Sequence, residues 1–168
     1  MKLFYSPTSP YTRRVCAALI LLDLQEQVEL INVSPFDAPQ ELIAVNPLSQ
    51  IPTLQLDSGE MLCGSALIVE YLNAQTEQRS LMAKCQPHWQ MKNLAGIAEG
   101  IVDAALAVVL ETRRPASQQS AEKITAWQDK ILRSVAYLEQ QSLQDDKVDL
   151  YQLMLGVALG YLDFRQPE

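Results

Sequence analysis

The chain of 168 residues is long enough to bury about 70% of its unfolded surface, so it needs neither disulfides nor a metal to stay folded. Hydrophobic residues make up 48% of the chain and charged residues 20%, which is typical of a globular protein. Thirteen Lys and Arg against twenty Asp and Glu give a net charge of −7, which argues against a nucleic-acid-binding module. There is one histidine, His88, so a metal site built from a pair of histidines is excluded.

The three cysteines, Cys16, Cys63 and Cys85, are odd in number and never form a C-x-x-C pair. They therefore predict neither a disulfide framework nor a zinc site. The apolar run over residues 15–22 is too short to span a bilayer, and no small-residue cleavage site follows it. We expect a cytoplasmic protein with reduced thiols that binds no metal, no nucleic acid and no membrane.

The first half of the chain alternates between strand and helix signals. Ser9 followed by Pro10 predicts a helix start, and apolar residues three or four apart continue that helix to Leu22. Ser65 is expected to cap a later helix that reaches Leu72. The order of elements is βαβαββα, a parallel pair with a right-handed crossover followed by a hairpin. The predicted strands are residues 2–5, 28–33, 51–56 and 61–63, with a short helix at 38–45.

Strand signals stop after about residue 75, and helical periodicity replaces them. One long helix is predicted to end near Arg114 and a second near Leu138. Asp149 and Gln152 have the spacing of a capping box that opens a third helix, residues 150–162, apolar almost all round and therefore buried. The predicted organisation is an α+β domain over 1–75, a linker over 76–86 and an all-helical domain over 87–168.

The sequence contains no nucleophile elbow, phosphate-binding loop or dinucleotide fingerprint. His88 is expected at a helix start or an interface rather than in a catalytic triad. Ser9 and Ser65 lie at helix starts, where exposed N–H groups and the helix dipole favour anions, although Ser9 alone also fits an ordinary N-cap. Pro52 before a strand can be cis and would then expose the backbone of Ile51. Together these features predict an acidic, peptide-like ligand.

Four segments, in this order, resemble the bacterial cytosolic glutathione transferase family of the serine type. They are SPTSPYTRRV from Ser6, NPLSQIPTL from Asn46, GSALIVEYL from Gly64 and LMLGVALGYLDFR from Leu153. The resemblance covers essentially the whole chain. It implies a thioredoxin-like N-terminal domain, an all-helical C-terminal domain that is short relative to the family, and a homodimer with a role in detoxification.

The resemblance also implies an activity, the attack of the glutathione thiolate on a small apolar electrophile, with glutathione as co-substrate and no metal. Ser9 would be the catalytic residue and would donate a hydrogen bond to the glutathione sulfur. Because a serine cannot form a mixed disulfide, thiol-disulfide reduction is disfavoured. The glutathione-binding residues would be Gln50, Ile51, Pro52, Gly64 and Ser65, and the second-substrate pocket would contain Pro10, Tyr11, Ile101, Ala105 and Val108.

Two positions depart from the family pattern. Gly64 stands where the family generally has Glu or Asp, and Gln50 stands where Lys is common. Each change removes a charge-assisted contact worth roughly 1.5–3 kcal/mol. The alternative function is therefore a non-catalytic, glutathione-transferase-like binding or interaction protein with a degraded glutathione site.

Overall fold

A computed structural model describes residues 1–76, 79–82, 89–143 and 148–165. The chain divides into two compact units, Met1–Leu81 and Met82–Glu168. The strands of the described chain all belong to the first unit, and its second unit consists of helices, which confirms the predicted fold class. The predicted linker lies largely outside the described residues, as do Cys85 and His88, so the expectations for them stay predictions.

The first unit is built on a four-stranded sheet with the strand order β2-β1-β3-β4. Its elements are β1 (Lys2–Tyr5), α1 (Pro10–Leu22), β2 (Glu29–Asn32), α2 (Gln40–Val45), β3 (Thr53–Gln55), β4 (Met61–Cys63) and α3 (Ser65–Ala74). β1 is parallel to β2 and antiparallel to β3, and β3 is antiparallel to β4. This is the predicted thioredoxin-like order, in which a helical crossover is followed by a hairpin.

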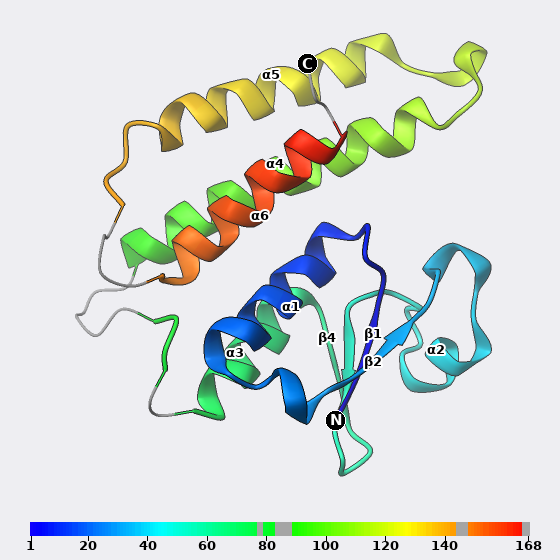
Figure 1. Ribbon diagram of the computed structural model, residues 1–168. Helices are drawn as coiled ribbons and strands as arrows, with labels where there is room; N and C mark the ends of the chain where they lie inside the picture. Colours follow the sequence, from blue (N-terminus) through cyan, green and yellow to red (C-terminus); the bar gives the residue numbers. More distant parts are fainter. Residues whose placement is uncertain (77–78, 83–88, 144–147, 166–168) are drawn as a thin grey trace. The chain divides into compact units, whose positions relative to one another are not determined.

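Helices lie on both faces of this sheet (Figure 1). Side chains alternate along a strand, so Leu3 and Phe4 of β1 point to opposite faces. Phe4 packs with Val33 and with Leu42 of α2 in one buried cluster. Helices α1 and α3 pack side by side on the face of Leu3, which is fully buried. Two cores, one on each face, therefore hold the sheet and fix where its strands end.

Among the predicted boundaries of the first unit that are wrong, three have a clear local reason. β3 begins at Thr53 rather than at residue 51, because Pro52 has no N–H to donate to the ladder. α2 begins two residues late, because Ala38 has a left-handed φ of 46°. Ser65 is the first residue of α3 and not its N-cap, a position that Gly64 occupies with φ 88° and ψ 126°.

The second unit contains α4 (Trp89–Thr112), α5 (Ala121–Leu138) and α6 (Leu150–Arg165). α4 packs along both α5 and α6 (Figure 1). Among the described helices, α4 alone is long and apolar enough to cross a bilayer, with a mean hydropathy of 1.7. Half of that apolar stretch is buried within the protein, a property that core helices of bundles share.

The capping box predicted at the start of α6 is confirmed. The N–H of Gln152 donates to Asp149 Oδ1 at 2.9 Å, and the N–H of Asp149 donates to Gln152 Oε1 at 3.0 Å. The expectation that residues 150–162 are buried is wrong at Leu159, which is 42% exposed, and Phe164, beyond the predicted end of the helix, is 49% exposed. The helix therefore presents an apolar stripe to α4 and leaves part of its apolar surface in solvent.

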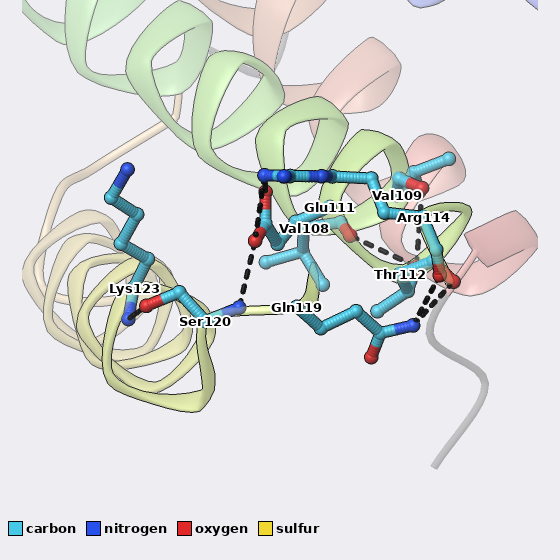
Figure 2. A network of polar contacts seen from close by, with 8 residues as sticks. All are labelled: Val108, Val109, Glu111, Thr112, Arg114, Gln119, Ser120 and Lys123. Carbon is cyan, nitrogen blue, oxygen red and sulfur yellow. Dashed lines mark hydrogen bonds and ion pairs between the residues drawn. The ribbon is translucent and has the colours of Figure 1, made fainter. Parts of the chain in front are cut away.

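A polar network closes the turn between α4 and α5 (Figure 2). Glu111 is buried and accepts from the N–H of Ser120 at 2.8 Å and from Arg114 Nη1 at 3.2 Å. The Gln119 amide donates to the carbonyl oxygens of Thr112 and Arg114, at 3.1 and 2.8 Å, and so satisfies acceptors at the end of α4. One carboxylate and one amide thus set the direction in which the chain enters α5.

The network predicts an acid-sensitive contribution to stability. The N–H of Ser120 lowers the pKa of Glu111 below its ordinary value of 4.5, burial opposes this, and Arg114 lowers it further. A carboxyl with a lowered pKa stabilises the fold fully above its unfolded pKa and loses that contribution as the pH falls through the folded one. The free energy of unfolding, measured by urea titration from pH 6 to pH 3, should therefore fall more steeply for the native chain than for Glu111→Gln. Parallel curves would contradict this role.

Candidate functional site

The register of the sheet brings the three predicted ligand-contacting segments to one end of it. Phe4 lies opposite Thr53, and Thr53 lies opposite Cys63. Because β3 is antiparallel to β1 and β4, the segments after β1, before β3 and after β4 meet at the same end. We call this the sheet-end site; its residues are Ser9, Gln50, Ile51, Pro52, Gly64 and Ser65.

Ser9 caps α1, as predicted. Its backbone is extended, with φ −83° and ψ 124°, and Pro10 takes the first helical position. Ser9 Oγ accepts a hydrogen bond from the N–H of Thr12 at 3.3 Å. A backbone N–H can only donate, so the Ser9 hydroxyl keeps its own hydrogen to donate to another group. The half-buried Ser9 is therefore arranged as a donor to an anion.

The peptide bond between Ile51 and Pro52 is cis, as the resemblance implies. Since β3 begins only at Thr53, the backbone of Ile51 lies just outside the strand ladder. A peptide ligand could extend the ladder there with main-chain hydrogen bonds. Gln50, by contrast, turns an exposed side chain to solvent.

Asn46 holds the loop that leads to this cis bond, and sequence analysis missed it. Asn46 is 0% exposed, and its Nδ2 donates to Thr53 Oγ1 at 2.8 Å and to the Gln50 carbonyl at 3.3 Å. Its Oδ1 accepts from the N–H of Leu48 at 2.9 Å. The pair Asn46-Pro47 signals a helix end, and nothing local shows that the side chain turns inward to a strand seven residues later.

Gly64 and Ser65 form the third segment. Gly64 turns the chain from β4 into α3 with a φ of 88°, which L-residues rarely adopt. The first bond of α3 runs from the N–H of Ile68 to the Gly64 carbonyl, so the N–H groups of the preceding turn have no intrahelical partner. Ser65 is 5% exposed, and its Oγ accepts from Nη1 of Arg14 at 3.4 Å.

The electrostatics of the sheet-end site favour an anion. Neither α1 nor α3 has an acidic residue in its first turn, so the positive end of each helix dipole is not neutralised locally. Arg14, which is 4% exposed, adds a formal positive charge between the two helices. In a chain of net charge −7, the two helix starts are thus features of this end of the sheet that favour an anion.

Comparison with known proteins identifies the family. The family model of the glutathione S-transferase N-terminal domain matches residues 3–80. Over 171 residues the chain is 33% identical to an uncharacterized GST-like protein of Escherichia coli K12, YibF, with 99% of this chain and 84% of that protein covered. The chain belongs to the glutathione S-transferase family.

Solved glutathione transferases share the fold. A family member from Pseudomonas fluorescens Pf-5 with bound glutathione has a TM-score of 0.92 at 34% identity, with 99% of this chain and 84% of that chain covered. A glutathione S-transferase from Methylobacillus flagellatus KT with glutathione bound has a TM-score of 0.88 at 32% identity and the same coverage. The resemblance stated from the four sequence segments is thereby confirmed.

The residues expected to form the second-substrate pocket of this transferase fold fall in different units. Pro10 and Tyr11 lie in α1 of the first unit, whereas the other three belong to α4 of the second, where they are buried. The pocket therefore stays a prediction. A separate hollow of about 230 Å³ in the second unit contains none of these residues; it is lined by Ile97, Lys130, Arg133, Ser134 and Tyr137.

Cys16 is a partly packed thiol. It lies in α1, half-buried, and burial raises the pKa of its thiol, against a smaller lowering by a backbone hydrogen bond. A raised pKa keeps the thiol protonated at neutral pH, and the protonated form is a poor nucleophile. Ser9, rather than Cys16, is therefore the side chain of α1 that is placed to interact with the thiol of a ligand.

The conformation of Gly64 predicts a stability difference between two glycine variants. Gly64→Ala forces φ near 88° on a residue with a Cβ, which should lower the free energy of unfolding by about 1–3 kcal/mol although no atom lies within 4 Å. Gly96→Ala in α4 is the matched control, because open space surrounds it too and alanine favours a helix by about 0.5–1 kcal/mol. Urea unfolding should give shifts of opposite sign; equal shifts would contradict the strain argument.

Proposed function

We propose that the protein binds glutathione at the sheet-end site and transfers its thiolate to small apolar electrophiles. The observation that carries the proposal is the convergence of Ser9, the backbone of Ile51 and Ser65 at one end of the sheet, where two helix starts without acidic residues favour an anion. These groups suit the three parts of an acidic peptide thiol, namely its sulfur, its backbone and its terminal carboxylate. Two glutathione-bound structures with the same fold support it.

The division of labour follows from the chemistry of each group. The Ser9 hydroxyl donates to the sulfur, the Ile51 backbone pairs with the cysteinyl residue, and the Ser65 hydroxyl and N–H hold the γ-glutamyl carboxylate. The thiolate then attacks an electrophilic carbon, an S–C bond forms, and the leaving group departs with its electron pair. The proton released on ionisation passes to solvent, so no metal and no general base is needed.

Hydrogen bonding by Ser9 is strong enough for this role. A thiol with pKa about 8.5 is roughly 3% ionised at pH 7, and lowering the pKa to about 6.5 gives roughly 75%. That shift needs about 2.7 kcal/mol of differential stabilisation. A hydrogen bond to a charged acceptor contributes about 1.5–3 kcal/mol, and the end of α1 adds to it.

The family resemblance suggests where the electrophile binds. Its proposed contacts are Pro10, Tyr11, Ile101, Ala105 and Val108. The protein is also proposed to be a cytoplasmic homodimer. Gln50 takes the place of a cation at the glycyl carboxylate, and Gly64 leaves the ligand ammonium without a carboxylate partner. These two positions favour the second candidate function, a non-catalytic, glutathione-transferase-like binding or interaction protein with a degraded glutathione site.

One experiment separates the two functions. Glutathione conjugation to a chloronitroarene is followed spectrophotometrically, beside calorimetric titration of the same sample with glutathione. Binding together with conjugation above the uncatalysed rate supports the transferase. Absence of conjugation to any of several electrophile classes contradicts the transferase, and weak or absent glutathione binding beside it supports the binding or interaction protein with a degraded site.

A further inference from the structure

Arg14 is a charged group that the structure connects to the sheet-end site, and the resemblance gave it no role. It lies in the second turn of α1 and is 4% exposed. Its Nη1 donates to Oγ of Ser65, a residue 51 positions away at the start of α3, over 3.4 Å. A guanidinium stays charged at all physiological pH values, so Arg14 carries its positive charge in a buried position.

The direction of this hydrogen bond determines what Ser65 can do. A guanidinium has only donors, so the Ser65 oxygen must be the acceptor. With a lone pair occupied by Arg14, the hydroxyl hydrogen points elsewhere and is available to an acceptor such as a carboxylate. The positive charge behind the oxygen also polarises the O–H bond and strengthens it as a donor. Ser9 is oriented in the same way, because the N–H of Thr12 donates to its oxygen and leaves its hydroxyl hydrogen for another acceptor.

We propose that Arg14 is a positioning residue that orients and polarises Ser65 for the α-carboxylate of the γ-glutamyl group. The inference rests on the proposed glutathione site. Arg14 acts through Ser65 and through its charge, and it does not itself touch the ligand. The recognised chemistry is a carboxylate at the start of α3, so a ligand without that carboxylate gains nothing from Arg14.

The neighbouring arginine provides a matched control. Arg13 lies on the same helix, carries the same charge and is exposed. Arg14→Met and Arg13→Met therefore change the net charge equally, but only Arg14→Met removes a buried side chain and its contact with Ser65. Two ligands are titrated calorimetrically against each variant, glutathione and 4-aminobutyryl-cysteinyl-glycine, which lacks only the γ-glutamyl α-carboxylate.

Arg14→Met should weaken glutathione binding about tenfold and change binding of the 4-aminobutyryl peptide less than about twofold. Arg13→Met should change neither. In a Ser65→Ala background the effect of Arg14→Met should shrink to less than about threefold, because the group through which it acts is gone. Equal losses for both ligands would show a merely structural role and overturn the inference.

Three further outcomes are defined. If Arg14→Met does not fold, Arg14→Lys is used, which retains a cation but not the guanidinium geometry, and it should weaken glutathione at least threefold more than the 4-aminobutyryl peptide. If the native chain binds glutathione but neither Arg14 variant discriminates between the ligands, only the role of Arg14 is wrong. If the native chain does not bind glutathione, the proposed function fails and the inference falls with it.

Discussion

Replacement of Ser9 by alanine should raise the pKa of the bound glutathione thiol by about two units, towards 8.5, and lower the thiolate fraction at pH 7 about 25-fold. The Ser9 hydroxyl keeps its hydrogen because the N–H of Thr12 occupies its oxygen, and alanine offers no donor in its place. The ultraviolet absorption of the bound thiolate against pH measures the shift. The deficit in conjugation should vanish well above pH 8.5, where the thiol ionises without help.

A second effect of Ser9→Ala must be separated from the first, because the variant also loses the N-cap of α1. Loss of a cap costs about 1 kcal/mol of stability. Ser120→Ala is the matched control, since Ser120 Oγ caps α5 by accepting from the N–H of Lys123, also at 3.3 Å. We expect similar losses of stability from both variants and a shifted thiol pKa from Ser9→Ala alone. A pKa shift of the same size in both variants would mean that it comes from the loss of stability and not from the loss of the Ser9 hydroxyl.

Asn46→Ala should lower the free energy of unfolding by about 2–4 kcal/mol. The substitution removes the donor to buried Thr53 Oγ1 and leaves the part-buried Gln50 carbonyl and N–H of Leu48 with one partner fewer. It also empties the volume of a side chain that is fully enclosed. Urea unfolding measures the loss, and exposed Asn32→Ala on β2 should change stability by less than about 0.5 kcal/mol.

The nearly isosteric Asn46→Asp tests the direction of these bonds. Its carboxylate would place an oxygen against the Gln50 carbonyl and against Thr53 Oγ1, which already donates to that carbonyl at 2.7 Å. Aspartate should therefore destabilise at least as much as alanine at pH 7. Glutathione binding should weaken in both variants, because Asn46 holds the loop that presents Ile51. A stable Asn46→Asp would contradict the assigned network.

The sequence predicted those elements whose signals are local. Ser9 with Pro10 marked the start of α1, and the pair Asp149 and Gln152 marked the start of α6, because a cap and its partner lie within four residues. The βαβαββα order followed from the same kind of signal. Local patterns of capping and periodicity were therefore sufficient for the fold class.

The rest of the site depends on contacts between distant segments. Arg14 is separated from Ser65 by 51 positions, and an arginine on a helix is ordinarily interpreted as a solvated residue. Asn46 marks a helix end locally, and only the packed loop shows that it bonds to Thr53. In the sequence pattern, Gly64 shows only that an acidic residue is missing. Its φ of 88° shows in addition that the turn into α3 itself suits a glycine. Such roles emerge from tertiary structure.

The central claim is that glutathione binds at the sheet-end site, and calorimetric titration at pH 7 of the native chain and of Ser65→Ala tests it most directly. The account predicts one glutathione per chain with a Kd below about 1 mM, which is about 4.1 kcal/mol of binding free energy, and at least tenfold weaker binding to Ser65→Ala. No binding to the native chain, or equal binding to the two, would contradict it.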